Sequence, residues 1–171
     1  NMGIVASLMS EMGYDAVGIG ALDRNMEDEY LGCALKQGLV VVDTTSEASV
    51  SSTPYIIKDI NGIKVGVVSY STCTSGNVVP SDVLQKFYTN YRFAREKADL
   101  LILLDQGEIV AKDWQQRWAG RLGAPDVVIA GVSKMPLSQV EVVGKTHIVP
   151  TSVQGRAIGV IDVKMDTSRK I

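Results

Sequence analysis

Few side chains in this sequence can act as metal ligands or nucleophiles of the usual kinds. The chain has a single histidine, His147, and two cysteines, Cys33 and Cys73. A zinc site or a catalytic cluster built on several histidines is therefore excluded. Cys73 stands among hydroxyl residues and before Gly76, a setting that could form a reactive thiol site or a nest for an anion. No Cys-x-x-Cys pair accompanies it, so a redox role is the weaker alternative.

Cys33 and His147 are both expected to be structural rather than catalytic residues. Cys33 falls on the inner side of a predicted helix, where we expect a core thiol. The two cysteines could form a disulfide if their Cα atoms came within about 7 Å, and the sequence leaves this open. His147 falls in a predicted late strand, where a hydrogen-bonded or surface histidine is expected rather than a catalytic one.

Composition narrows the class of protein. The 171 residues are 46% hydrophobic and 21% charged, with a formal net charge of −2. These values are typical of one globular domain and exclude a disordered chain or a disulfide scaffold. Non-specific electrostatic binding to nucleic acid or to an anionic membrane is not expected at this net charge. No apolar run reaches the roughly 18–20 residues that a membrane span needs.

Hydrophobic periodicity and turn residues predict alternating helices and strands. Asn61-Gly62, between two strand-like runs, is the clearest hairpin signal. A helix opening at Pro80-Ser81-Asp82 carries an inner stripe that ends at Ala94. The predicted helices span 2–12, 26–37, 82–99 and the region around Trp114 and Trp118. The predicted strands span 14–20, 39–42, 54–60, 63–70, 100–104, 126–130, 140–143, 146–149 and 157–165.

This order predicts an α/β sandwich with a mixed sheet, because strands follow strands after residue 130. In open α/β sheets, ligands bind at loops that follow the carboxyl ends of strands. We therefore expect chemistry at one or more of four loops, 18–23, 69–76, 105–108 and 131–135.

Five segments, in order, resemble the metal-dependent phosphoesterase domain of the 5′-nucleotidase and UDP-sugar hydrolase group, the calcineurin-like metallophosphatases. "MGYDAVGIGALD" at 12–23 is similar to "MGYDAVxxGNHEFD", and "PYIIKDINGIKVGVVSYST" at 54–72 to the segment after the family's next strand. "ADLLILLDQGE" at 98–108 resembles "ADLxIxLSHxG", and "APDVVIAGVSKM" at 124–135 resembles "xPDxIxxGHSH". The stretch 144–163 resembles the closing "GxxIVQxGxxGxxxGxLDL". The resemblance implies a metallophosphatase-like fold over residues 1–171, as a single, partial domain, because the family's earlier Asp-x-His and Gly-Asp motifs are absent.

The departures from these motifs bear on function. The resemblance places the family's metal-bridging Asn and catalytic His at Ile19 and Gly20, and its following acid at Ala21. Ligand histidines are replaced at Asp105, Val132 and Lys134. A two-metal phosphoesterase site needs several carboxylate and imidazole ligands. Of the positions carried over, only Asp105 can hold a hard cation, so no metal cofactor is expected; Mn²⁺ or Zn²⁺ would be needed only if the domain were an active hydrolase.

Two of these positions have a chemical and a structural interpretation. Asp105 is either a residual metal ligand or, in the interpretation we favour, a capping residue of the following helix. Lys134 is either a binding group for a small anion such as phosphate or a solvated lysine, and the two could form an ion pair across the old site. Trp114 and Trp118 share one helix face, which favours core packing; an exposed one would mark a partner surface.

The sequence thus predicts a degenerate 5′-nucleotidase-like domain that serves as a binding or assembly module. The alternative is a hydrolase whose ligands are completed by a segment outside this chain, or thiol chemistry at Cys73. Missing strand units would leave an unpaired edge or an apolar face. We therefore expect a second copy or a second protein chain to cover it. The resemblance also implies a location outside the cytoplasm.

Overall fold

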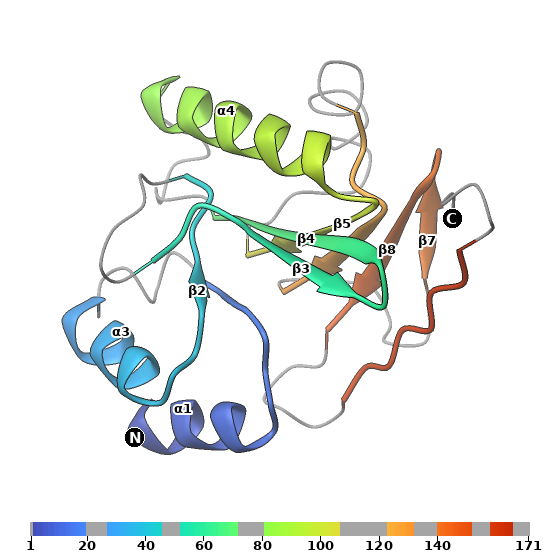
Figure 1. The fold of residues 1–171 in the computed structure, drawn as a ribbon. Coiled ribbons are helices and arrows are strands. Elements are labelled where there is room, and N and C mark those ends of the chain that lie inside the picture. Colours follow the sequence, from blue (N-terminus) through green and yellow to red (C-terminus); the bar gives the residue numbers. More distant parts are fainter. Residues whose placement is uncertain are drawn as a thin grey trace.

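The computed structural model describes residues 2–19, 27–45, 52–71, 81–106, 123–131, 140–151 and 158–165. Figure 1 shows its helices and strands, which form two units of unequal size. The helices are α1 (Met2–Glu11), α3 (Glu27–Lys36) and α4 (Ser81–Lys97). The strands are β1 (Val17–Gly18), β2 (Val41–Val42), β3 (Ile56–Ile60), β4 (Ile63–Tyr70), β5 (Leu100–Asp105), β6 (Val127–Ala130), β7 (Glu141–Val143) and β8 (Thr146–Pro150).

The larger unit is a six-stranded mixed sheet with the order β3-β4-β5-β6-β8-β7. The central strands β4, β5, β6 and β8 run parallel, and antiparallel hairpins close both sides of the sheet. The β3–β4 hairpin turns at Asn61 and Gly62, whose φ angles are 55° and 82°. Two successive positive φ angles are the conformation that Asn-Gly adopts most readily in a tight hairpin.

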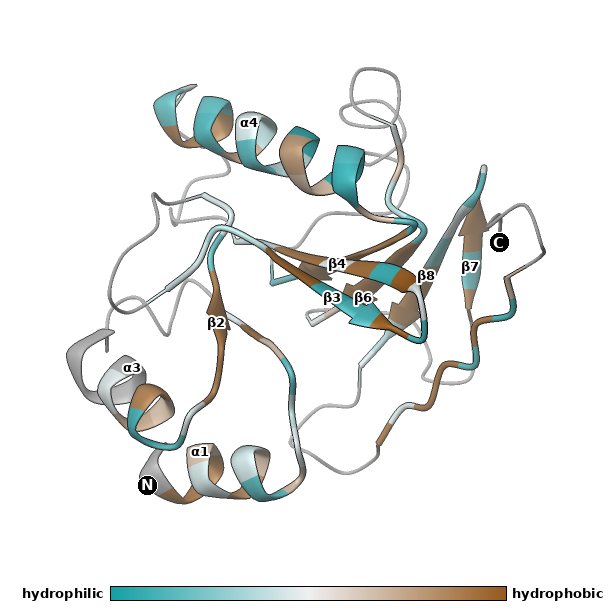
Figure 2. Cartoon of the chain, viewed as in Figure 1, coloured by the Kyte–Doolittle hydropathy of each residue, from teal (hydrophilic) through white to brown (hydrophobic). Residues whose placement is uncertain are grey.

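Helix α4 lies across one face of this sheet (Figure 1). Phe87, Tyr91 and Ala94 form its buried stripe, and each is at most 1% exposed. The ring of Phe87 packs edge-on against that of Tyr70 on β4, with centroids 5.1 Å apart. Figure 2 shows the same division, since α4 is largely hydrophilic away from the sheet. The main hydrophobic core therefore lies between α4 and the sheet.

The C-terminal part of α4 is fastened to the sheet by a network around Asp126. Its carboxylate accepts hydrogen bonds from Arg95 Nη1 at 2.7 Å and from the backbone N–H of Leu101 at 2.6 Å. The Tyr91 hydroxyl donates to the carbonyl of Gly123 at 2.9 Å. These bonds fix the helix against the starts of β5 and β6.

The smaller unit consists of α1, α3 and the parallel pair β1–β2, with its own hydrophobic cluster. Ala6, Val17 and Leu39 are among its buried members. Asp15 forms an exposed ion pair with Lys58 on β3, and an isolated bridge joins Val42 to Thr53. The described residues therefore form two hydrophobic cores, one for each sheet.

Helices α1, α3 and α4 and most strands confirm the sequence predictions, whereas the helix predicted around Trp114 and Trp118 lies outside the described residues. Three strands differ from their predictions, and the first of these, predicted over 39–42, is only β2. The predicted strand 14–20 is only β1, because Val17 and Gly18 alone pair with β2. The predicted strand 157–165 is irregular over its described part, 158–165, where no ladder partner lies within the described residues. Ile158 and Val160 are 73% and 82% exposed there. Among the described residues, no helix is long and apolar enough to cross a membrane.

Candidate functional site

The carboxyl ends of the parallel strands meet at one edge of the large sheet, as expected from the sequence. Tyr70, Asp105 and Ala130 are register partners at the ends of β4, β5 and β6. The N–H of Gln106 donates to the carbonyl of Tyr70 at 2.8 Å, and that of Gly131 donates to the carbonyl of Asp105 at 2.7 Å. These bonds extend the ladder beyond the strands and hold the residues that follow them in register.

The two sheets also meet at this edge. A β-carbon on Gly18, at the end of β1, would lie 2.7 Å from Ser69 Oγ and 3.4 Å from Gln106 Nε2. One on Gly131 would lie 2.6 Å from Gln106 Oε1. The carboxamide of Gln106 therefore lies between the two glycines and fills the space that they leave open. We call Gly18, Ser69, Asp105, Gln106 and Gly131 the strand-end site.

Asp105 is 1% exposed, as is expected of a residue at the end of a central strand. Its burial leaves little surface for a ligand that arrives from solvent. Whether Asp105 caps the helix expected after it stays a prediction, because residues 107–122 lie outside the described part of the chain. Ser69 is also buried, at 2% exposed. The strand-end site thus presents a carboxamide to its surroundings, while its carboxylate lies beneath.

A buried polar turn, Asp43-Thr44-Thr45, follows β2 beside this site. Asp43 Oδ1 accepts hydrogen bonds from the N–H and the hydroxyl of Thr45, at 3.1 and 2.6 Å. Thr44 donates to the carbonyl of Pro54 at 2.6 Å, and its Oγ1 accepts the N–H of Ser69 at 2.8 Å. The Thr44 hydroxyl therefore connects the small unit to β4 at the strand-end site.

Sequence reasoning missed Gln106 and Thr44. Counted from Ala98-Asp99-Leu100, the histidine of "ADLxIxLSHxG" falls on Gln106 and the serine on Asp105, one position away from the assignment to Asp105. Aligning the motif letter by letter from Ala98 would have pointed to Gln106 from the sequence. Thr44 lies in a Ser/Thr-rich run that gives no positional signal.

Aligned letter by letter from Met12, the Asn and His of "MGYDAVxxGNHEFD" fall on Ala21 and Leu22 rather than on Ile19 and Gly20. Ile19 is 2% exposed and packs in the core of the small unit, while its correspondence to a family position stays a prediction. Several predicted positions lie outside the described residues: Gly20, Ala21, Cys73, Trp114, Trp118, Val132 and Lys134. The ion pair between Asp105 and Lys134 therefore stays a prediction.

The remaining candidates lie away from the strand-end site. His147 pairs with Val127 at the start of β6, whereas the site follows the end of that strand. Cys33 is a half-buried free thiol against the core of the small unit, as expected for a packing residue. Its candidate disulfide partner, Cys73, is not among the described residues.

The donors at the strand-end site do not fit a two-metal centre. Such a centre needs several carboxylates and imidazoles around cations about 3.5–4 Å apart. The only imidazole of the chain is at the far end of β8, and Asp43 Oδ1 already accepts two hydrogen bonds. Within the described ranges, no three His, Cys, Asp or Glu residues gather closely enough to hold a metal ion.

Comparison with solved structures identifies the fold. The chain is similar to Thermus thermophilus sulfate thiohydrolase SoxB in complex with glycerol, with a TM-score of 0.58, 18% identity, and coverage of 85% of this chain and 29% of that one. It is also similar to a 5′-nucleotidase precursor from Thermus thermophilus, with a TM-score of 0.56, 15% identity, and coverage of 85% and 34%. Haemophilus influenzae NAD nucleotidase gives a TM-score of 0.53 at 16% identity, with coverage of 77% and 26%.

These likenesses show the fold, which is the metallophosphatase-like α/β fold of 5′-nucleotidase-type proteins. By sequence alone, no protein-family model and no curated protein matches the chain. The chain spans about a third or less of the length of each of these three structures.

Proposed function

We propose that this chain is a non-catalytic binding or assembly module built on the 5′-nucleotidase-type fold. The observation that carries this proposal is the position of Gln106, whose neutral carboxamide lies between Gly18 and Gly131 at the edge where ligands bind in α/β sheets. A carboxamide cannot supply the charge that a pair of divalent cations requires. Fold alone does not confer activity, because activity depends on the side chains of the site.

Metal content and hydrolysis, measured on one sample, test this proposal. The protein is offered Mn²⁺ and Zn²⁺, analysed for bound metal, and assayed with p-nitrophenyl phosphate. We expect neither stoichiometric metal nor turnover. Stoichiometric metal with turnover that Asp105→Asn abolishes would overturn the proposal. The alternative, a hydrolase completed by a segment outside this chain, predicts turnover only in a longer polypeptide that contains it.

Exposed apolar side chains support a role in assembly. Ile4 and Leu8 on α1 and Met12, directly after it, follow one another at intervals of four residues and are 56%, 51% and 55% exposed. Together with Val5 they form the α1 stripe, which the exposed Glu11 borders at the C-terminal end of the helix. Apolar side chains gathered in this way mark an interaction surface on a soluble protein. We propose that a second copy or a second protein chain covers the α1 stripe.

Two further parts of the proposal concern ligand and location. A small anionic ligand at Lys134 remains a proposal that rests on the sequence. A location outside the cytoplasm is supported only by the family resemblance and by a similar structure that is described as a precursor.

A further inference from the structure

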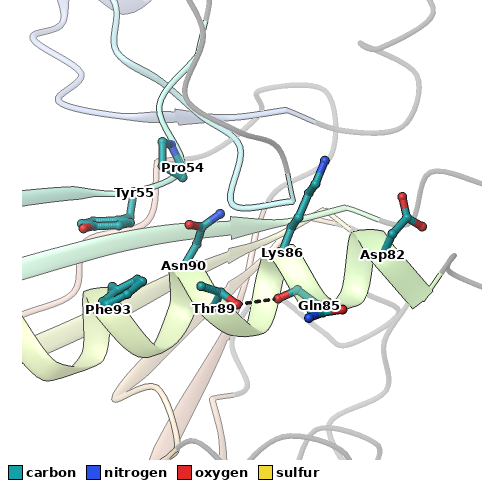
Figure 3. Close-up of a pocket in the computed structure, with 8 residues that line it drawn as sticks. All are labelled: Pro54, Tyr55, Asp82, Gln85, Lys86, Thr89, Asn90 and Phe93. Atoms are coloured by element: carbon teal, nitrogen blue, oxygen red, sulfur yellow. Dashed lines mark hydrogen bonds between the residues drawn. The ribbon is translucent and has the colours of Figure 1, made fainter.

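A groove of about 620 Å³ runs along α4 where the helix passes the segment that leads into β3 (Figure 3). Pro54 and Tyr55 line one wall, and six residues of α4 line the other: Asp82, Gln85, Lys86, Thr89, Asn90 and Phe93. These α4 residues recur every three or four positions, so they form a second stripe beside the one that packs on the sheet. None of the lining residues belongs to the strand-end site.

One end of the groove is aromatic and flanked by cations. Tyr55 and Phe93 lie at this end (Figure 3), and Phe93 is 43% exposed although it is a large apolar residue. The guanidinium carbon of Arg92 lies 5.8 Å from the centroid of the Phe93 ring. Lys97 Nζ lies 5.3 Å from the centroid of the Tyr55 ring and 3.0 Å from its hydroxyl oxygen. The exposed ring of Phe93 and the half-buried ring of Tyr55 offer surface to an aromatic ligand, and the cations beside them favour one that also carries negative charge.

The floor of the groove is fixed in place by hydrogen bonds. Asn90 Nδ2 donates to the carbonyl of Thr44 at 3.0 Å, and the Thr44 hydroxyl donates to the carbonyl of Pro54 at 2.6 Å. Thr44 itself is fully buried. Both walls are therefore held to the same buried turn, so a ligand would not have to order them on binding.

The other end of the groove is polar. Lys86 lies seven residues before Phe93 on α4, which places their Cα atoms roughly 10 Å apart along the helix axis. Asp82 lies one turn further and would repel a second anionic group placed there. Glu96, an acid three residues after Phe93, is paired with Arg92 at 3.9 Å. The arrangement favours one negative charge between the rings and Lys86.

We propose that this groove binds a small ligand in which an aromatic ring is joined to one anionic group. The ring packs against Phe93 and Tyr55, and the anionic group lies toward Lys86. A nucleoside monophosphate and an aromatic carboxylate share this chemistry. The proposal is independent of whether the strand-end site is catalytic.

Amide chemical shifts in the ¹⁵N-labelled protein test the proposal, with adenosine monophosphate and indole-3-propionate as probes. We expect at least one probe to shift amides of Tyr55 and of residues 82–93, and adenosine, which lacks the anion, to bind more weakly. Binding of one probe alone identifies its class as the ligand source. If neither probe shifts these amides up to about 10 mM, where affinities become negligible, the proposal is overturned.

Variants assign the two ends of the groove. Phe93→Ala should lower the affinity for the probe that binds about tenfold, because a ring–ring contact and its buried area are lost. Ile60→Ala is the matched control, since Ile60 is 45% exposed at the β3–β4 hairpin and should leave the affinity unchanged. Lys86→Gln should weaken both anionic probes but not adenosine. Equal affinities for the wild type and Phe93→Ala, with both folded by circular dichroism, would overturn the proposal.

Discussion

The side chain of Gln106 occupies the space that a β-carbon on Gly131 would need, since its Oε1 lies 2.6 Å from that position. The carbonyl oxygen of Asp105 is the next nearest atom, at 3.1 Å. The first of these contacts can be relieved by rotating a flexible side chain, whereas the second involves the backbone. The pair therefore shows how tightly the strand-end site is filled, and it can be tested by substitution.

Gly131→Ala should destabilise the protein by about 1–2 kcal/mol, because the new methyl group displaces the Gln106 carboxamide. In a Gln106→Ala background the same substitution should cost about 0.5–1 kcal/mol less, since only the contact with the Asp105 carbonyl remains. Urea denaturation of the four proteins measures this coupling. Additive effects would show that Gln106 does not fill this space.

Local signals were enough to predict much of the fold from the sequence. The Asn61-Gly62 turn fixes its hairpin because both residues tolerate positive φ, and the α4 stripe at Phe87, Tyr91 and Ala94 follows helical spacing. The strand prediction was wrong for 158–165, because a strand also needs a partner for its backbone hydrogen-bonding groups. Its sequence satisfies the pattern, but no described segment pairs with it.

The candidate site was less predictable, for a physical reason. Gln106 meets Gly18 and Gly131 only because parallel strands from distant parts of the chain end at one edge. Polar residues after a strand carry no periodicity that would report such a meeting. Motif counting finds the position of Gln106 but not its contact with the two glycines.

Thr44→Val should cost about 2–3 kcal/mol of unfolding free energy. The substitution keeps the shape of the side chain but leaves the Ser69 N–H and the Pro54 carbonyl without their buried partner. Thr44→Ser keeps the hydroxyl and should recover most of the loss, which separates the hydrogen bonds from packing. No loss for Thr44→Val in chemical denaturation would show that the two hydrogen bonds contribute nothing, and a loss for Thr44→Ser as large as that for Thr44→Val would show that the methyl group contributes as much as the hydroxyl.

The Arg95–Asp126 and Arg92–Glu96 ion pairs of α4 should differ in how much they contribute to the free energy of unfolding. Arg95 and Asp126 are 22% and 24% exposed and lie 2.7 Å apart, so Arg95→Ala should cost about 2 kcal/mol by leaving a half-buried carboxylate less well paired. Arg92 and Glu96 are 59% and 62% exposed at 3.9 Å, so Arg92→Ala should change stability by less than about 0.5 kcal/mol. Thermal melts of both variants at the same pH make the comparison, and similar losses would contradict it.

Because of Tyr91, the stability of the protein should depend on pH in the alkaline range. Burial raises the pKa of its phenol well above the ordinary value of 10.0, with Arg95 lowering the pKa in part and Asp126 raising it further. The folded-state pKa is higher than that of the unfolded chain, so the contribution is fully present below pH 10 and is lost as pH rises from there toward the folded pKa.

Tyr91→Phe should therefore lose about 0.5–1.5 kcal/mol near neutral pH, where the hydrogen bond to the Gly123 carbonyl is removed. Its stability should fall less steeply than that of the wild type above about pH 10, because no buried phenol remains to ionise. Urea midpoints measured across this range test the slope. Parallel curves for the two proteins would mean that another group governs the alkaline loss.

The α1 stripe gives the prediction that bears most directly on assembly. If a second copy covers Ile4, Leu8 and Met12, light scattering should give a mass above the 18.4 kDa of one chain at high protein concentration. Leu8→Glu should return the protein to that mass, because a charge cannot be buried in an apolar contact without a partner.

Ile60→Glu provides the matched control, since it places the same charge at a 45% exposed apolar position on the β3–β4 hairpin. The hairpin variant should keep the mass of the wild type. A loss of association in both variants would implicate net charge rather than the α1 stripe. A wild-type mass of one chain at every concentration would exclude self-association, and the occupant of the stripe would then have to be a different polypeptide.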